Sequence, residues 1–192
     1  MTDSAHDSPA GDTEHNPPLE RLTEEQFRHQ MRQAAHLLSN GQGEDALPLL
    51  RRCHDLHPDD PDVLINLGGA YILAGRHRLA VPLLERASEL DPDNPAVWSN
   101  LAAAYLGQIV LSTLTKQERA LAAYRRVIEL DAAYPNVHYN MGLIFIDRRD
   151  WDAAHAAFTL AIESNPHDGD AHAMRQRVEQ LRDQPTSSPP VN

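Results

Sequence analysis

The side chains most suggestive of chemistry are the single cysteine and its neighbouring histidines, in the run Cys53-His54-x-x-His57. Thiolate and imidazole groups are common zinc ligands. Zinc ligands must converge on one point, however, whereas Cys53 falls at a small apolar helix position and His57 at the end of that helix, beside Pro58. The run also lacks the paired spacing typical of zinc sites. The sequence therefore predicts no metal site and no cofactor.

No set of side chains that would carry a reaction is evident. There is no Gly-rich phosphate loop, and no serine or cysteine is placed near a histidine by a known motif. Cys53 is expected to be a buried structural thiol. A single cysteine excludes an internal disulfide and is consistent with a reducing compartment. The sequence therefore predicts that the protein is not an enzyme.

Three asparagines have a spacing that does suggest a function. Asn66, Asn100 and Asn140 are separated by 34 and 40 residues. Asparagine is a mediocre helix former, about 0.6 kcal/mol worse than alanine, so its recurrence needs a reason. A side-chain amide offers a donor and an acceptor together and can pair with any peptide group. The spacing favours a binding role, although the amides could instead satisfy local contacts between helices.

The segments that carry these asparagines are copies of one helical unit. Pro58, Pro92, Ala132 and Pro166 lie 34, 40 and 34 residues apart, in the runs CHDLHPDDP, ASELDPDNP, VIELDAAYP and AIESNPHDG. Small and large residues recur between them at helical spacing. Each proline ends a helix because it cannot continue one. The period predicts four stacked helix–turn–helix units.

The repeated positions resemble those of the tetratricopeptide repeat (TPR) family. In the second unit the matching residues are Leu64, Leu67, Gly68, Tyr71, Ala80, Leu84, Ala87, Leu90 and Pro92. The resemblance covers about residues 23–183. It implies an all-α fold, an α-solenoid of TPR repeats wound as a right-handed superhelix, closed by a C-terminal capping helix.

The chain is expected to divide into one folded domain and two tails. We place a disordered acidic tail at 1–20, the TPR domain at 21–183 and a second disordered tail at 184–192. The repeats fall at about 27–60, 61–94, 95–134 and 135–168, with the capping helix at about 169–183. Capping boxes are predicted at Thr23 with Gln26 and at Thr115 with Glu118.

In TPR proteins that bind extended peptides, the equivalent asparagines line the concave groove, so the resemblance implies this role for Asn66, Asn100 and Asn140. Arg28 and Arg32 would add positive charge at one end. The remaining groove positions suggest an apolar floor, formed by Ile65, Ile72, Leu73, Leu106, Tyr139 and Ile146. The lysines of a carboxylate clamp for chaperone C-termini are mostly missing. We therefore expect a scaffold or adaptor that binds a partly apolar, extended segment of a protein partner.

Six extra residues interrupt the third unit. Four of the apolar side chains here are candidates for a partner patch: Ile109, Val110, Leu111 and Leu114. Helical spacing suggests that the preceding helix runs on for a turn or two. The apolar residues either fold back on the neighbouring helices or form a contact with a partner or with a second copy. The second possibility makes a self-associating assembly protein the alternative function.

Charge narrows the range of partners. The formal net charge is −11, from 28 acidic and 17 basic residues. Such a surface repels nucleic acid and anionic membranes, so neither is expected as a partner. The first 20 residues contain five acids and no lysine or arginine, unlike a secretory signal, so a cytoplasmic protein is expected. We expect a monomer or weak homo-oligomer, and the acidic tail could occupy the end marked by Arg28 and Arg32.

Overall fold

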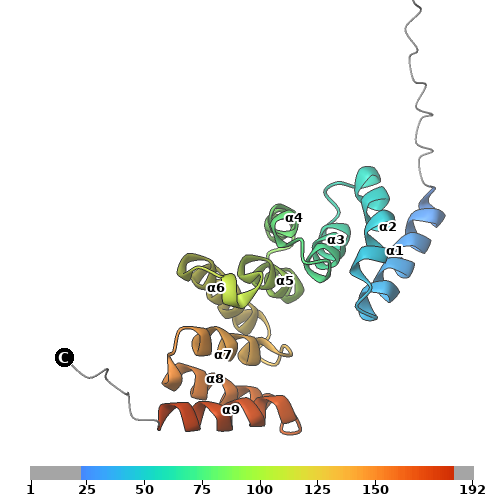
Figure 1. Ribbon diagram of the computed structural model, residues 1–192. Coiled ribbons are helices and arrows are strands. Elements are labelled where there is room, and N and C mark those ends of the chain that lie inside the picture. Colours follow the sequence, from blue (N-terminus) through green and yellow to red (C-terminus); the bar gives the residue numbers. More distant parts are fainter. Residues whose placement is uncertain (1–22, 184–192) are drawn as a thin grey trace, which may run out of the picture.

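The computed structural model describes residues 23–183, which form nine α-helices and one short 3-10 helix and contain no strand (Figure 1). The predicted tails, 1–20 and 184–192, lie outside the described residues. The helices are α1 (Glu24–Ser39), α2 (Gly43–Leu56), α3 (Pro61–Leu73), α4 (His77–Leu90), α5 (Pro95–Leu106), η1 (Ile109–Leu111), α6 (Leu114–Leu130), α7 (Val137–Asp147), α8 (Trp151–Ser164) and α9 (Gly169–Arg182).

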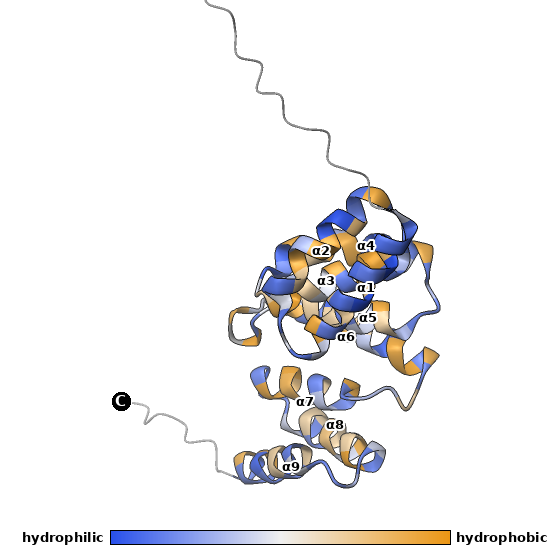
Figure 2. Cartoon of the chain, turned by 90° about the vertical axis from the view of Figure 1, so that its right-hand side faces the viewer, coloured by the Kyte–Doolittle hydropathy of each residue, from blue (hydrophilic) through white to orange (hydrophobic). Residues whose placement is uncertain are grey.

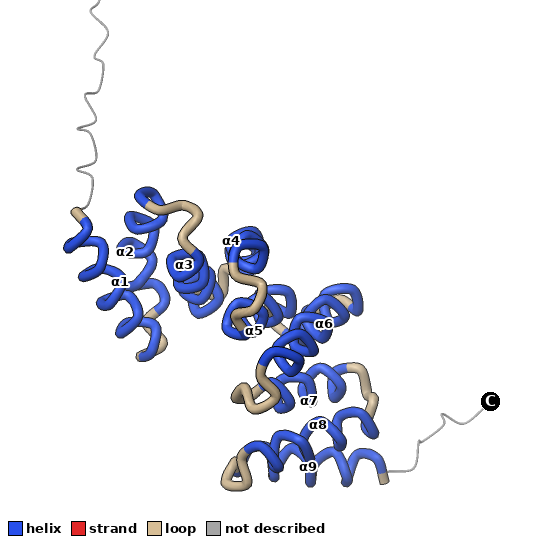
Figure 3. Tube along the Cα trace, turned by 180° about the vertical axis from the view of Figure 1, so that it is seen from behind, coloured by secondary structure: helices blue, strands red, loops and turns tan. Residues whose placement is uncertain are grey.

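The helices pack as successive pairs along a curved stack (Figures 1 and 3). The pairs are α1 with α2, α3 with α4, α5 with α6 and α7 with α8, and α9 packs on α8 at the end. Figure 1 shows α1, α3 and α5 toward the inner side of the arc and α4 and α6 toward its outer side. The predicted all-α solenoid is therefore confirmed.

Within a pair, the helices approach closely because a small residue lies at the crossing. A Cβ atom added to Gly68 would lie 2.6 Å from Leu84 Cγ, and one added to Gly142 would lie 2.7 Å from the Phe158 ring. Both distances are too short for a real side chain. The glycines thus allow the large residue of the second helix to fill the space directly above the backbone of the first.

The helix ends agree only partly with the sequence predictions. The capping box of α1 is present: the Gln26 N–H donates to Thr23 Oγ1 at 3.2 Å, and the Thr23 N–H donates to Gln26 Oε1 at 2.8 Å. The predicted box at Thr115 is wrong, because α6 starts earlier than its position implies. Thr113 is the N-cap, and its Oγ1 accepts from the Lys116 N–H.

The prediction that the helix before the insertion runs on is also wrong. Helix α5 ends at Leu106, because Gly107 adopts a φ of +60°, which a helix cannot continue. The chain then forms η1 and enters α6, which at 17 residues is longer than the second helix of every other pair. The insertion therefore forms a short turn and lengthens α6.

The junction between α6 and α7 differs from the others. These two helices touch less than any other consecutive pair of α-helices between residues 23 and 183. Figure 2 shows α7, α8 and α9 as a group set below the rest of the stack. Helix α3 begins at Pro61 and α5 at Pro95, but α7 begins two residues after Pro135, because Asn136 has a φ of +63°. Because α7 starts later in its repeat, less of this helix is available to pack against α6.

Candidate functional site

The three repeated asparagines lie at matching positions on α3, α5 and α7, and all three are half-buried. The start of α3 is fixed by Asp60, whose side chain accepts from two backbone N–H groups of the first turn. Asn94 caps α5 in the same way, through one such bond. Because both helices then begin with proline at equivalent positions, Asn66 and Asn100 have the same register on their helices. The result is a pair of equivalent amides on neighbouring first helices.

Asn140 differs from the other two in its surroundings. Its side chain lies near the hydroxyl of Tyr124 on α6 and lowers the pKa of that group. Burial outweighs this lowering and raises the pKa of Tyr124 to about 12. Helix α1 packs on α3 and α3 on α5, but α5 has no comparable contact with α7 among the described helices. The structure therefore groups Asn66 with Asn100 and ties Asn140 to the α6–α7 junction.

The two arginines predicted at one end of the groove lie on α1, where both are exposed. Arg28 and Arg32 line a cavity of about 250 Å³ together with Phe27, Met31, Asp60 and Asp62. The two carboxylates offset the two guanidinium charges. This end of the stack is therefore of mixed charge, not the positive site that the arginines alone suggest.

The predicted apolar floor is half-buried, apart from Leu73, which is exposed. Ile65 packs against the cluster of Leu64, Ala87 and Val97. Its side chain thus both supports the core and reaches the surface of α3.

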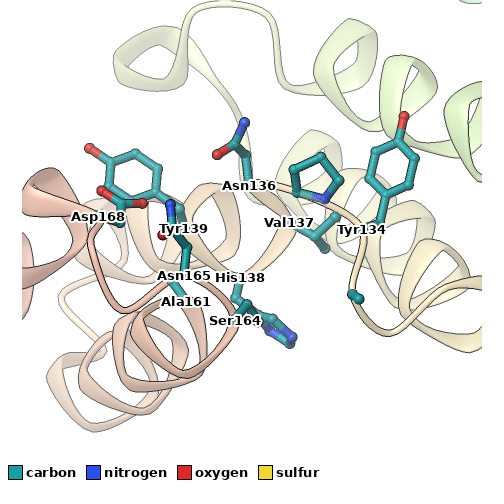
Figure 4. Close-up of a pocket in the computed structure, with 11 residues that line it drawn as sticks. Tyr134, Asn136, Val137, His138, Tyr139, Ala161, Ser164, Asn165 and Asp168 are labelled. Atoms are coloured by element: carbon teal, nitrogen blue, oxygen red, sulfur yellow. The ribbon is translucent and has the colours of Figure 1, made fainter.

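Tyr139 lies on α7, toward the other end of the stack, where its ring meets Phe158 edge-on with centroids 5.5 Å apart. It lines a small cavity of about 110 Å³ at the start of α7, shown in Figure 4 with Asn136 and Asp168 nearby. Burial, and then the carboxylates of Asp170 and Asp168, raise the pKa of Tyr139. Its hydroxyl therefore remains a protonated donor at neutral pH.

The apolar residues of the insertion are divided between two environments. Ile109 packs against the buried cluster that α5, α6 and α7 share. Leu111 and Leu114, by contrast, are 72% and 70% exposed. The side chain of Val110 is not among those that the structure describes. The insertion is thus anchored by one residue and presents two leucines to solvent.

The sequence reasoning missed a second set of polar residues around the insertion. A cavity of about 430 Å³ lies between the start of α4, the end of α5, the insertion and the start of α6. Its charged lining residues are all basic: Arg76, Arg78, Lys116 and Arg119, with His77 beside them. The run Arg76-His77-Arg78 is visible in the sequence, but its approach to Lys116 depends on the path of the insertion.

Residues 23–183 contain neither a cluster of metal ligands nor a membrane-spanning helix. No group of three or more histidine, cysteine, aspartate or glutamate side chains comes together there as a set of metal ligands. None of the helices in this range is long and apolar enough to cross a bilayer.

Comparison with known protein families agrees with the repeat pattern. Family models described as TPR repeat and tetratricopeptide repeat match residues 68–108 with 116–148, residues 37–80 and residues 139–175. The chain belongs to the tetratricopeptide repeat family. The first of these matches is interrupted between 108 and 116, which is the position of the insertion. No curated protein matches the sequence.

Solved structures with the same fold include a crystal structure of MamA protein, with a TM-score of 0.67 and 19% identity over 83% of this chain and 84% of that one. TTC0263, a thermophilic TPR protein in Thermus thermophilus, has a TM-score of 0.69 and 18% identity over 82% and 83% of the two chains. The MamA RS-1 ArsTM double mutant has a TM-score of 0.69 and 19% identity over 85% and 88%. At these identities the likeness is one of fold.

Proposed function

We propose that this protein is a non-catalytic scaffold that binds an extended peptide segment of a partner along the inner surface of α1, α3, α5 and α7. The TPR fold supports protein–protein interaction in general. The observation that carries the finer proposal is the register of Asn66 and Asn100, two half-buried amides at equivalent positions of neighbouring helices. Equivalent amides suit a ligand whose own donors and acceptors repeat, and an extended peptide is such a ligand.

The flanking residues narrow the chemistry of the ligand. Ile65 and Tyr139 supply half-buried apolar surface beside the asparagines. Arg28 and Arg32 share their cavity with two carboxylates, so that end favours a polar segment of mixed charge over a strongly acidic one. Asn140 lies beside Tyr124 at the α6–α7 junction, and we assign it a smaller share of binding than Asn66 and Asn100.

The test is affinity capture from a lysate of the source organism, with the bound proteins identified by mass spectrometry. The intact chain is compared with the double variant Asn66→Ala/Asn100→Ala. The matched control is Gln176→Ala/Gln180→Ala, which removes two amides of α9. We expect a partner that the control retains and the asparagine variant loses, with both variants folded by circular dichroism. A partner retained equally by all three proteins would contradict the proposal.

A second function, self-association through the insertion, is favoured by one specific observation. Leu111 and Leu114 are largely exposed, and covering two such leucines removes apolar surface from water. In this function the protein forms a homo-oligomer, and Ile109 anchors the insertion that makes the contact.

Light scattering over a range of concentrations separates the two functions. Self-association predicts a mass that rises with concentration, and Leu111→Ser/Leu114→Ser should return it to that of the monomer. The matched control Leu90→Ser/Leu160→Ser changes two other exposed leucines. A monomer mass at every concentration would exclude the second function and leave the first untouched.

A further inference from the structure

The cavity beside the insertion is unusual in its charge. All of its charged lining residues are basic, in a chain whose formal net charge is −11. Two of them are already neutralised. Arg76 Nη2 donates to both carboxylate oxygens of Glu44 at 2.9 and 3.0 Å, and Arg119 Nη2 donates to Glu85 at 2.6 Å. The two arginines line the cavity, whereas Glu44 and Glu85 do not.

The other two cations are free to attract a ligand. Neither Arg78 nor Lys116 forms an ion pair with any residue between 23 and 183. Both belong to the first turns of helices, α4 and α6, and neither of these turns contains an acidic residue. The partial positive charge of the two helix starts therefore adds to that of the side chains instead of being cancelled by a local carboxylate.

The wall of the cavity also has an unused polar atom. The Nδ1 atom of His77 is buried and makes no hydrogen bond within the described part of the chain. A buried polar atom without a partner is costly, and a turn of the His77 ring that presents this atom to a ligand in the cavity would remove the cost. Burial and the nearby Lys116 lower the pKa of His77, so the ring is neutral at pH 7 and can pair without adding charge.

The rim of the cavity is apolar. Leu79 is half exposed and Leu111 is largely exposed, and both belong to the lining. A free inorganic anion would leave these side chains in water, whereas a peptide could cover them while placing carboxylates near the two cations. The chemistry that fits is therefore an acidic peptide segment.

The chain contains such a segment outside the described residues. Residues 1–20 hold five acidic side chains and no lysine or arginine. The cavity of Arg28 and Arg32 is a poorer match for it, because Asp60 and Asp62 line that cavity as well. We propose that the acidic N-terminal segment, residues 1–20, docks in the basic cavity between α4 and α6 of the same chain.

The length of the segment allows this contact. Asp7 lies 16 residues before Thr23, which an extended chain can span over roughly 50 Å. Helix α1 packs on α3, α3 on α5 and α5 on α6, and packed helices are about 8–10 Å apart, which gives roughly 30 Å across the stack. Helix α6 starts at the end of the helices opposite Thr23, which adds the length of α1, 16 residues or roughly 24 Å, so the straight path is roughly 40 Å. A tethered segment of this length also has an effective concentration in the millimolar range, which populates a contact built from weak ion pairs.

The proposal is tested with the full chain by paramagnetic relaxation. A nitroxide is attached at Ser8→Cys, and the buried Cys53 stays unlabelled because it is not accessible. We expect enhanced relaxation at the amides of Gln108, Leu111 and Lys116. The effect should fall roughly fivefold in Arg78→Glu/Lys116→Glu, the loss expected from two exposed ion pairs.

The matched control is Arg125→Glu/Arg177→Glu, which makes the same change in net charge at two arginines of α6 and α9. It should leave the relaxation pattern unchanged. Enhancement at Arg28 and Arg32 instead, an equal loss in the control, or no localised enhancement would overturn the proposal. Enhancement that appears equally when labelled chains are mixed with isotope-labelled ones would assign the contact to a second copy and would also overturn it.

Discussion

The junction between the second and third repeats and the junction between the third and fourth are built from the same repeat sequence but held by different contacts. At the first, residues of α3, α4 and α5 share one apolar cluster that includes Leu84 and Leu101. At the second, α5, α6 and α7 also share an apolar cluster, which includes Val127 and Ile144, but the contact between α6 and α7 is smaller and includes Gln117, a polar residue that is only 1% exposed. The amide of Gln117 donates to Asp147 Oδ2 at 2.7 Å and accepts from Arg148 Nε at 2.7 Å.

The difference shows how an insertion changes a repeat protein. The extra residues do not enlarge the stack; they lengthen the start of α6, and that start carries Gln117 and Glu118 toward the end of α7. Glu118 pairs with Arg148, whose Nη2 is buried and has no hydrogen-bond partner between residues 23 and 183. Polar contacts of this kind fix a geometry but add less stability than apolar burial. Because α6 and α7 also touch less than the other consecutive helices between residues 23 and 183, we expect the α6–α7 junction to be the weaker of the two.

The largest effect is expected at the apolar junction. Leu101→Ala removes a nearly fully buried side chain from the shared cluster and should lower the free energy of unfolding by about 2–5 kcal/mol. Urea unfolding, monitored by circular dichroism, measures this free energy. Leu79→Ala, at a half-exposed leucine, is the control and should cost much less. If Leu101→Ala lowered the free energy of unfolding no more than Leu79→Ala, apolar packing would not be what holds this junction.

A smaller effect is expected at the polar junction. Gln117→Ala leaves Asp147 and Arg148 without their shared partner and should lower the free energy of unfolding by about 1–3 kcal/mol. Combined with Arg148→Ala, the two losses should not add, because the residues share one network. Additive losses would show that Gln117 acts through packing alone. Gln176 on α9 supplies the control, with an expected change near zero.

The fold could be predicted from the sequence because its determinants are local or periodic. The glycines at helix crossings, the proline positions and the capping box at Thr23 each act within one repeat. The α6 start could not be placed because two threonines, Thr113 and Thr115, are both suitable caps, and the choice depends on where η1 ends.

The candidate site was predictable only in part. The sequence identifies the asparagines by their spacing, but the placement of Asn140 beside Tyr124 depends on how α6 and α7 meet across the altered junction. The exposure of Leu111 and the packing of Ile109 likewise depend on the path of the insertion, since both are apolar and two residues apart. No local pattern encodes such contacts between repeats.

A third, smaller effect on stability is expected at the repeated asparagines, where Asn140 and Asn66 should behave differently. Asn140→Ala removes the polar side chain beside the buried Tyr124 hydroxyl and should cost about 0.5–1.5 kcal/mol of stability. Asn66→Ala should instead be neutral or stabilising by about 0.6 kcal/mol, because alanine is the better helix former. Thermal unfolding of both variants measures the difference. Equal losses would mean that Asn66 is also a structural residue, which would weaken its assignment to peptide binding.

The smallest effect is expected in the insertion. Leu111 is largely exposed, so Leu111→Ser should change the free energy of unfolding by no more than about 0.5 kcal/mol. Ile109→Ser should cost clearly more, because Ile109 packs on the cluster that α5, α6 and α7 share. The two variants are compared by urea unfolding. A large loss at Leu111 would show that its exposed position is covered in solution.

Hydrogen exchange measured along the chain tests the central comparison most directly. Exchange reports the free energy at which each part of the stack opens. We predict that α7, α8 and α9 open at a lower free energy than α1 and α2, the other end of the stack, and that Gln117→Ala lowers it further while leaving α1 and α2 unchanged. If both ends open at the same free energy, or if Gln117→Ala affects them equally, the polar junction is not the weaker one.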